Sequence, residues 1–387
     1  MRMFREYKIC QIGEVVGGGT PSTDNEEFWD GNIPWITPKD LTGYSSVYIS
    51  HGENYITRAG MNKSGTKMLP AKTVLFSSRA PIGYVAIAQN PICTNQGFKS
   101  IICDEKIIDP LYFYYYIKSN LEYFKQWGSG ATFPEISGNA MKRIKVNIIN
   151  DIDSQRKIAK TLYCYDNLIE VNNKRIKVLE QMAENLYKEW FVRFRFPGHE
   201  TAEFENGIPK GWEISKISDI ATIKAGGDKP DAFSDAPTEE CPIPIFSNGL
   251  DKDGLYGYTN KAVIENESVT ISARGTVGFV CLRRKPYVPI VRLVAVIPKT
   301  QTVTPLYLYY YLRRDSVIAN GTSQQQITVP MVSRKRMIIP PASLLQAFDK
   351  REYPIWNLTE QLKAQNESLI QQRDLLLTRL MSGKLEV

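Results

Sequence analysis

The sequence contains few of the residues that catalytic and metal centres usually need. Its 387 residues include only two histidines, His51 and His199, which weakens the case for a hydrolytic triad or a zinc site. The six cysteines are scattered without a C-x-x-C pair, so we expect reduced thiols rather than disulfides or metal ligands. No run of 18 or more uncharged apolar residues occurs, and residues 1–6 contain no apolar signal core. We therefore expect a cytoplasmic protein with no membrane span.

The composition is typical of a folded protein with more than one domain. Hydrophobic residues make up 43% and charged residues 23% of the chain. The length predicts two or three domains. The net charge of +7 suits a polyanionic partner, and most of the excess lies in residues 1–150 and 201–340. These two regions are therefore the better candidates for binding a polyanion.

A duplication is the most informative feature of the sequence. The segment SSRAPIGYV at 77–85 recurs as SARGTVGFV at 272–280, and DPLYFYYY at 109–116 recurs as TPLYLYYY at 304–311. Both pairs are separated by 195 residues, which chance rarely produces. The chain therefore contains two copies of one unit.

Each copy begins with a strand-rich part. Short apolar runs at 73–76 and 84–88 predict two strands that flank a turn, and the runs at 269–271 and 279–282 predict the same in the second copy. Pro110 and Pro305 fit the first turn of a helix, with Asp109 and Thr304 as its N-caps. The tyrosine-rich run that follows is expected to pack one face inward.

Each copy ends in a long helix with a heptad pattern. In the first copy the apolar positions are Ile158, Leu162, Tyr165, Ile169, Ile176, Leu179, Ala183, Leu186 and Trp190. Asn172 fills the vacant position and is the single candidate for a buried polar residue that sets the register. From 165 to 191 the helix would be about 40 Å long.

The second helix repeats the pattern with Ile355, Leu362, Leu369 and Leu376, accompanied by Leu358 and Leu380. Pro354 should break or kink the start of this helix. Two apolar seams on one chain favour an antiparallel pair of helices. We therefore predict an α+β fold with two similar mixed α/β domains, which two long antiparallel coiled-coil helices join as an internal pseudo-twofold repeat.

The motifs that suggest catalysis are incomplete. Gly17-Gly18-Gly19 lacks the lysine and spacing of a P-loop, and it predicts either a turn with positive φ or a loop against a nucleic-acid backbone. Asp109-Pro110-Leu111-Tyr112 resembles the D-P-P-Y signature of DNA adenine methyltransferases but lacks the second proline, and no glycine-rich S-adenosylmethionine loop accompanies it. We predict no catalytic residue and no metal site, and hence a binding protein.

Polar and basic side chains at equivalent turns are the candidates for DNA contact. Arg79 and Arg274 could bind a guanine edge or a phosphate, or could form an ion pair within the domain. Asn95 and Gln96 could pair with adenine or could belong to an ordinary loop. The basic cluster at 283–285 is expected to attract phosphate, whereas Trp35 is expected in the core. The complete predicted set is Thr20, Ser22, Lys39, Ser78, Arg79, Asn95, Gln96, Ser129, Thr132, Lys229, Asn248, Arg274, Thr276, Arg283, Arg284, Ser323, Gln324 and Gln325.

Taken together and in order, several segments resemble the specificity subunit of type I restriction–modification systems. Those in the first recognition domain lie at 20–22, 33–41, 77–83, 95–97 and 128–133. The segments at 155–159 and 186–194 resemble the two ends of the central region, and 211–214 resembles the start of the second recognition domain. In the second copy, 289–291 stands where the first has Asn95-Gln96-Gly97, and the glutamine near the helix start is displaced to Gln346.

The resemblance implies four regions. They are a first target-recognition domain at 1–150, a central helical spacer at 151–200, a second target-recognition domain at 201–341 and a C-terminal helical spacer at 342–387. Each recognition domain would bind one half of a split double-stranded DNA target. The helices would hold the two domains about 10 bp apart.

The resemblance also implies partners. The helices would dock two methyltransferase subunits, and restriction subunits with translocase activity would join through them. The chain itself would hold no cofactor, because S-adenosylmethionine, ATP and Mg belong to the partner subunits. Two alternatives remain open at this point: a self-sufficient DNA modification enzyme, and a coiled-coil scaffold with domains that bind sugar or protein.

Overall fold

The computed structural model describes residues 4–130, 134–315 and 326–385, and the chain divides into two compact units. Unit 1 comprises Met1–Arg175 and Leu362–Val387, and unit 2 comprises Ile176–Gln361. Each unit has its own strands and short helices and a section of both long helices, α6 (Ile152–Tyr187) and α10 (Ala342–Met381). No helix in the described ranges is long and apolar enough to cross a bilayer.

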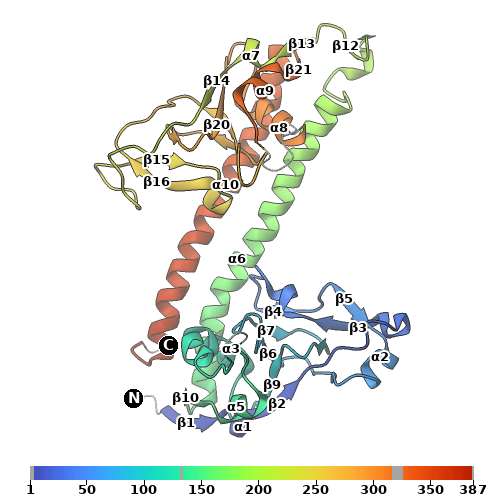
Figure 1. The fold of residues 1–387 in the computed structure, drawn as a ribbon, viewed down its shortest axis with the longest axis vertical. Coiled ribbons are helices and arrows are strands. Elements are labelled where there is room, and N and C mark those ends of the chain that lie inside the picture. Colours follow the sequence, from blue (N-terminus) through green and yellow to red (C-terminus); the bar gives the residue numbers. More distant parts are fainter. Residues whose placement is uncertain (1–3, 131–133, 316–325, 386–387) are drawn as a thin grey trace. The chain divides into compact units, whose positions relative to one another are not determined.

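Unit 1 contains three sheets, and its helix at 110–119 lies beside the first half of α6, whereas its helix at 58–62 lies at the far edge of the unit (Figure 1). Its five-stranded sheet has the order β2-β9-β6-β7-β4, its three-stranded sheet the order β5-β3-β8, and β1 pairs with β10. The strands are β1 Phe4–Lys8, β2 Gly13–Gly17, β3 Trp29–Ile36, β4 Tyr48–Ile49, β5 Asn54–Ile56, β6 Val74–Phe76, β7 Val85–Ala88, β8 Cys93–Thr94, β9 Lys99–Cys103 and β10 Lys145–Ile149. The helices are α1 Ile9–Ile12, η1 Glu26–Phe28, η2 Pro38–Leu41, α2 Arg58–Asn62, α3 Pro110–Ser119, α4 Leu121–Lys125 and α5 Gly138–Arg143.

Unit 2 repeats this arrangement with few changes. Its four-stranded sheet has the order β14-β20-β17-β18, its three-stranded sheet the order β16-β15-β19, and β13 pairs with β21, while β11 and β12 form a separate hairpin. The strands are β11 Phe204–Glu205, β12 Ile208–Pro209, β13 Glu213–Lys216, β14 Ala221–Ala225, β15 Ile243–Phe246, β16 Leu255–Thr259, β17 Ser268–Ile271, β18 Val280–Arg283, β19 Val288–Pro289, β20 Val294–Pro298 and β21 Arg336–Ile339. The helices are the π-helical turn η3 Lys188–Val192, η4 His199–Thr201, α7 Ile217–Ile220, η5 Asp251–Gly254, α8 Pro305–Arg314 and α9 Val329–Arg334.

The two sheet orders correspond strand by strand, which confirms the predicted repeat and the α+β class. β2, β9, β6 and β7 of unit 1 occupy the places of β14, β20, β17 and β18 in unit 2. The predicted strand pairs around the two turns are confirmed as the antiparallel pairs β6–β7 and β17–β18. The predicted caps are confirmed too, because Asp109 accepts the Tyr112 N–H at 2.9 Å and Thr304 accepts the Tyr307 N–H at 3.4 Å.

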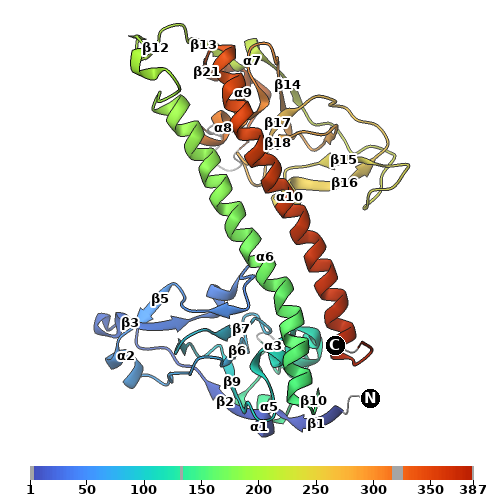
Figure 2. The same ribbon diagram turned by 180° about the vertical axis from the view of Figure 1, so that it is seen from behind.

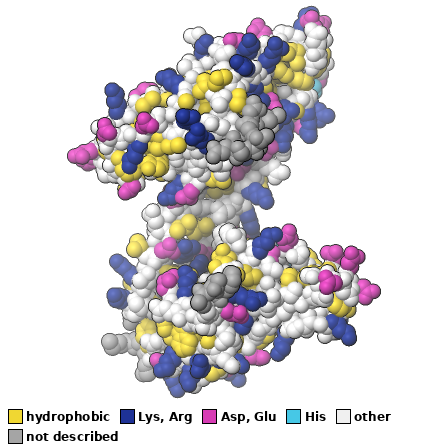
Figure 3. All heavy atoms as spheres, in the orientation of Figure 1, with side chains coloured by type: hydrophobic (Ala, Val, Ile, Leu, Met, Phe, Trp, Pro, Cys, Tyr) yellow, Lys and Arg dark blue, Asp and Glu magenta, His cyan; other side chains and the backbone are white. Residues whose placement is uncertain are grey.

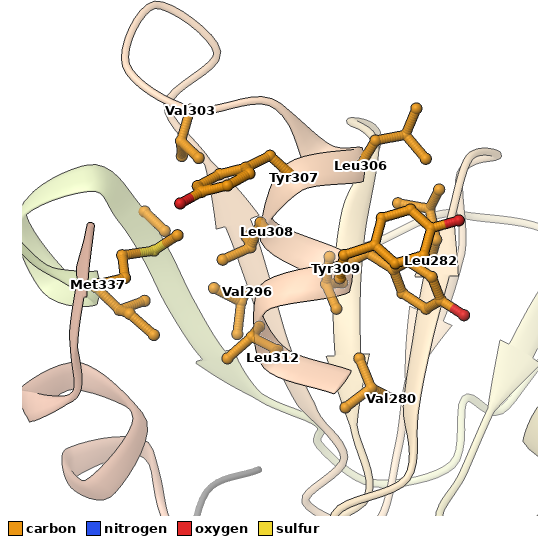
Figure 4. Packing of buried hydrophobic residues seen from close by; sticks show 14 of the residues in the cluster. Val280, Leu282, Val296, Val303, Leu306, Tyr307, Leu308, Tyr309, Leu312 and Met337 are labelled. Carbon is orange, nitrogen blue, oxygen red and sulfur yellow. The ribbon is translucent and has the colours of Figure 1, made fainter. Parts of the chain in front are cut away.

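The tyrosine-rich helices α3 and α8 form the centre of each core. Tyr112, Tyr114 and Tyr115 of α3 are at most 2% exposed. In unit 2, Leu308 and Leu312 of α8 point toward Val296 of β20 (Figure 4). These buried side chains hold the sheet and its turns against the long helix, which gives the turns a rigid base.

In unit 1 the long helices α6 and α10 run antiparallel, as predicted. Asn172 of α6 contacts Asn366 of α10, and Asp166 of α6 contacts Arg373 of α10. The contact six residues earlier on α6 thus lies seven residues later on α10, so the two helices run in opposite directions. Figure 2 shows the last part of α10 beside α6 in this unit. In unit 2 the ring of Trp190 lies 6.0 Å from that of Phe348 between centroids.

Three details of the predicted helices are wrong. First, α6 begins at Ile152 and has 36 residues, about 54 Å at 1.5 Å per residue, so it is longer than expected. Second, Asn172 is not the single buried polar residue, because Asp166 is 6% exposed as well. Asp166 and Tyr187 are buried, whereas the predicted neighbours Tyr165 and Leu186 are only half-buried.

Third, Pro354 does not break its helix, because α10 begins twelve residues earlier and continues through it. Pro354 and Lys350, whose carbonyl loses its helical partner, are both exposed. Water can therefore satisfy this carbonyl. Phe348 and Glu352, on the opposite face, are buried in unit 2 and hold the helix in place.

Candidate nucleic-acid interface

The β6–β7 turn of unit 1 carries Arg79, and its backbone is fixed by Ser77. The Ser77 N–H donates to the Tyr84 carbonyl and the Gly83 N–H donates to the Ser77 carbonyl, both at 2.9 Å. In unit 2 the Ser272 N–H and the Gly278 N–H make the same two bonds at 2.9 Å. Both arginines therefore lie on turns that the same pair of backbone hydrogen bonds closes.

Arg79 belongs to a small charged group. Its Nη1 lies 3.5 Å from Glu135 Oε2, and Lys99 Nζ lies 3.1 Å from Glu135 Oε1. The Arg79 side chain is 38% exposed, so it remains accessible while it contacts the carboxylate. Two cations around one carboxylate leave a net positive charge, which suits a DNA phosphate or a guanine edge.

Three loops meet beside Arg79. The Gly97 carbonyl accepts the Ser78 N–H at 2.7 Å and the Ser78 hydroxyl at 3.1 Å. The Asn95 side chain accepts the Gly97 N–H at 2.9 Å, and the Thr20 hydroxyl donates to the Gln96 side chain. Ser78 is fully buried, so it supports the loop, whereas Thr20 and Gln96 are exposed. The structure thus brings together five of the predicted residues of unit 1.

The prediction of a positive-φ turn at Gly17, Gly18 and Gly19 is wrong, because none of the three has a positive φ. A Cβ on Gly18 would lie 2.0 Å from the Asn95 carbonyl oxygen, and one on Gly19 would lie 2.5 Å from the Thr66 nitrogen. These glycines allow close approach of backbone to backbone. Their role is to pack this loop against its neighbours.

In unit 2, Asn248 joins the Arg274 turn to the next loop. Its side-chain oxygen accepts the Ala273 N–H at 2.7 Å, its side-chain nitrogen donates to the Val291 carbonyl at 2.7 Å, and its carbonyl accepts the Thr276 hydroxyl at 2.8 Å. Arg274 is exposed and donates to Gln326 at 3.3 Å. Asn248 and Thr276 therefore position this turn.

The expected basic cluster at 283–285 is not one exposed surface. Arg283 is 7% exposed, lies 3.6 Å above the ring of Phe246, and donates to the Thr270 hydroxyl and the Asp253 carbonyl. Burial lowers the pKa of its guanidinium. Arg284 pairs with Glu267 at 3.0 Å. A phosphate contact requires an exposed guanidinium. The prediction is therefore wrong for Arg283, whose guanidinium is buried and has partners in the interior.

Among the remaining predicted residues, Ser129 lies next to the Arg79 turn, because its backbone exchanges two hydrogen bonds with that of Glu135 at 3.0 and 2.9 Å. The others have separate partners, are exposed, or lie outside the described residues. Lys39 pairs with Glu53 at 2.8 Å, and Lys229 Nζ lies 3.3 Å from the ring centroid of Phe233. Ser22 and Ser129 are exposed. Thr132, Ser323, Gln324 and Gln325 lie outside the described residues. Trp35, expected in the core, is 5% exposed.

The alignment of the second copy requires a correction by one residue. Strand β8 pairs Thr94 with Ile36, and β19 pairs Pro289 with Phe246 in the same parallel arrangement. Asn95-Gln96-Gly97 therefore corresponds to 290–292, not to 289–291. Sequence reasoning missed Val291 and Arg292 for this reason, although the offset of 195 residues leads to them.

The features that suggested catalysis have structural roles. The carboxylate of Asp109 caps α3, and its backbone N–H donates to Gln155 at 2.8 Å. Within the described ranges, no group of three or more His, Cys, Asp or Glu side chains is arranged to hold a metal ion. On the face in Figure 3, Lys and Arg side chains alternate with Asp and Glu over both units. On this face the basic side chains are therefore interspersed with acidic ones and do not gather in one broad basic surface.

Comparisons with known proteins agree with this arrangement. The family model of the type I restriction modification DNA specificity domain matches residues 1–181 and 209–352. The type I restriction enzyme MjaIX specificity subunit of Methanocaldococcus jannaschii is 35% identical over 408 residues, which cover 98% of this chain and 93% of that protein. The EcoR124I/EcoR124II specificity subunit of Escherichia coli is 32% identical over 209 residues, 51% of this chain and 50% of that protein.

A solved structure has the same fold. The S subunit of a type I restriction–modification system from M. genitalium superposes with a TM-score of 0.71 at 14% identity. The superposition covers 98% of this chain and 96% of that one.

Proposed function

The chain belongs to the family of type I restriction–modification DNA specificity subunits, and from this premise we propose that unit 1 and unit 2 each recognise one half of a bipartite DNA target. The chain binds DNA and assembles with other subunits of such a system. Catalysis belongs to those partner subunits. A protein with this task works on cellular DNA, which we propose it meets in the cytoplasm.

The repeated turn with an arginine carries this proposal. Arg79 and Arg274 project from turns with the same backbone hydrogen bonds in two units with the same sheet order. The neighbouring loops differ, with Gln96 in unit 1 and Val291 in the equivalent place of unit 2. Equal scaffolds with unequal loops suit a target whose two halves have different sequences.

We propose that the long helices set the gap between the halves and dock two methyltransferase subunits. In unit 1, Leu168 and Val171 lie three residues apart on one face of α6 and are 40% and 43% exposed. A partner helix could cover them. The methyltransferase subunits would supply S-adenosylmethionine, and restriction subunits would use ATP and Mg, while this chain holds none of these groups.

Modification mapping tests the proposal directly. The chain is expressed with its cognate methyltransferase subunits, and every methylated base in the host DNA is identified by sequencing. We expect one motif with two specified halves around an unspecified gap. Methyl transfer by the purified chain alone would favour a self-sufficient enzyme. If the chain neither co-purifies with a methyltransferase nor prefers any DNA sequence, a scaffold is favoured.

A further inference from the structure

The loop of unit 2 beside the Arg274 turn has an unusual backbone. Val291 and Arg292 have φ values of 52° and 61°, in the left-handed region, although neither is glycine. This region is especially unfavourable for a β-branched residue such as valine. Both side chains are exposed, Val291 by 53%. The need to bury an apolar side chain therefore does not explain the conformation.

Three hydrogen bonds hold the loop in this conformation. The Val291 N–H donates to the Gly227 carbonyl at 2.8 Å, and the Arg292 N–H donates to the Gly226 carbonyl at 3.0 Å. The side-chain nitrogen of Asn248 donates to the Val291 carbonyl at 2.7 Å. A strained loop that the surrounding structure fixes so fully is typical of a functional contact.

The same asparagine fixes the loop relative to Arg274. Its side-chain oxygen accepts the N–H of Ala273, the residue before Arg274, at 2.7 Å. Val291, Arg292 and Arg274 are therefore presented by two loops with one common support.

The surroundings of Arg292 differ from those of Arg79 and Arg284. Arg79 contacts Glu135 and Arg284 contacts Glu267, whereas among the described residues no acidic side chain lies within ion-pair distance of Arg292. Its exposed guanidinium is free of such competition for an external acceptor.

From these observations we infer that Val291 and Arg292 determine the base specificity of unit 2. Arg292 donates two hydrogen bonds to the O6 and N7 acceptors of a guanine, and Val291 contacts the methyl group of a neighbouring thymine. In unit 1 the equivalent Gln96 and Gly97 present an amide and no side chain, so the two units prefer different bases. This inference rests on the proposed function.

The test uses the complete methyltransferase complex and a plasmid library with a randomised target. Wild type, Val291→Gln and Arg292→Ala are compared by sequencing of the methylated bases, with Val263→Gln as control because Val263 is a 57% exposed valine of the same unit. We expect Arg292→Ala to lose ~10- to 100-fold of its preference for guanine at one base pair. Val291→Gln should lose the preference for thymine at the neighbouring base pair. The other half-site should stay unchanged in both variants, and the Val263→Gln complex should methylate the same motif as wild type.

Val291→Gly separates a recognition role from a structural one. Glycine adopts positive φ without strain, so the melting temperature of the chain should rise. We expect this rise to accompany a loss of thymine preference. A rise with unchanged preference, or an unchanged target for Arg292→Ala, would overturn the inference while the proposed function stands. Absence of any bipartite motif for the wild type would instead refute the proposed function.

Discussion

Asn172 of α6 donates a hydrogen bond from its side-chain nitrogen to the side-chain oxygen of Asn366 of α10 at 2.9 Å, and both residues are buried. Asn172 also donates to Gln365 at 2.8 Å, and Asn366 donates to Asn173 at 2.8 Å. A buried layer of amides is satisfied in only one alignment of two helices. The layer therefore sets their register in unit 1.

Replacement of Asn366 by alanine should destabilise unit 1, because Asn172 loses a buried acceptor. We expect a loss of about 1–3 kcal/mol in the free energy of unfolding, measured by urea denaturation. Ser368→Ala, on the exposed side of α10, should change it by less than about 0.5 kcal/mol. Replacement of both Asn172 and Asn366 by leucine should restore stability, because neither residue is then an unpaired buried amide. Equal stability of Asn366→Ala and wild type would contradict the layer's role.

Asp166 is another buried polar residue of α6. Its carboxylate lies 2.5 Å from Arg373 Nη1 of α10 and accepts the Tyr115 hydroxyl at 2.5 Å. Asp166→Ala removes the buried acceptor of the Tyr115 hydroxyl and one of the two carboxylates that pair with Arg373, whose guanidinium keeps Asp374 at 2.8 Å. We therefore expect a loss of about 1–3 kcal/mol by denaturation. Lys174→Ala removes an exposed pair with Glu170 and should cost at most about 0.5 kcal/mol. Similar losses for both variants would show that burial of the first pair has no energetic consequence.

Asp349 should make the stability of unit 2 depend on pH. Burial raises the pKa of its carboxyl from 3.8 to about 6, although the Thr304 hydroxyl opposes the shift. Folding therefore favours the protonated form, and this contribution is lost as the pH rises from about 4 through about 6. Asp349→Asn should melt at a higher temperature than wild type at pH 7.5, and the difference should disappear near pH 4.

Thermal melts at the two pH values test this expectation, with the exposed Asp228→Asn as control. If the melting temperatures of Asp349→Asn and wild type differ by the same amount at both pH values, ionisation of the Asp349 carboxyl is not the cause of the difference.

Arg79 and Arg274 should act on different halves of the target. We expect Arg79→Ala to lose about 1–3 kcal/mol of base discrimination in one half-site and Arg274→Ala to do so in the other, measured by modification mapping with the methyltransferase subunits present. Glu135→Gln is the matched variant, since it removes the ion pair but keeps Arg79. If Arg79 only pairs within the unit, both variants will alter stability and leave the target unchanged.

The length of the helices should set the unspecified gap. Seven residues inserted into α6 after Arg175 and into α10 before Leu362 add about 10 Å of helix, equal to about 3 bp of DNA. The mapped gap should lengthen by this amount while both half-sites stay the same. The same insertion in α6 alone mismatches the two helices and serves as control. An unchanged gap in the double insertion would reject the proposal.

Much of the fold was predictable because it depends on local patterns. The 195-residue offset revealed the repeat, and Asp109-Pro110 predicted both the start and the cap of α3. The apolar spacing predicted the seam of α6 but not the burial of Asp166. A heptad pattern counts apolar residues, whereas a carboxylate is buried only where Tyr115 and Arg373, distant in sequence, supply partners.

The candidate site was less predictable for the same reason. Arg79 and Arg274 were evident from the repeat, but Arg283 was expected in a basic cluster and is buried above Phe246. Val291 and Arg292 were missed because β19 differs in sequence from β8, and strand pairing confirms the equivalence that the 195-residue offset gives. Sequence alone determined the repeat, the long helices and the family resemblance, since these follow from periodicity and order. The tertiary structure decided which polar side chains are buried, paired or free, because that depends on neighbours brought together by folding.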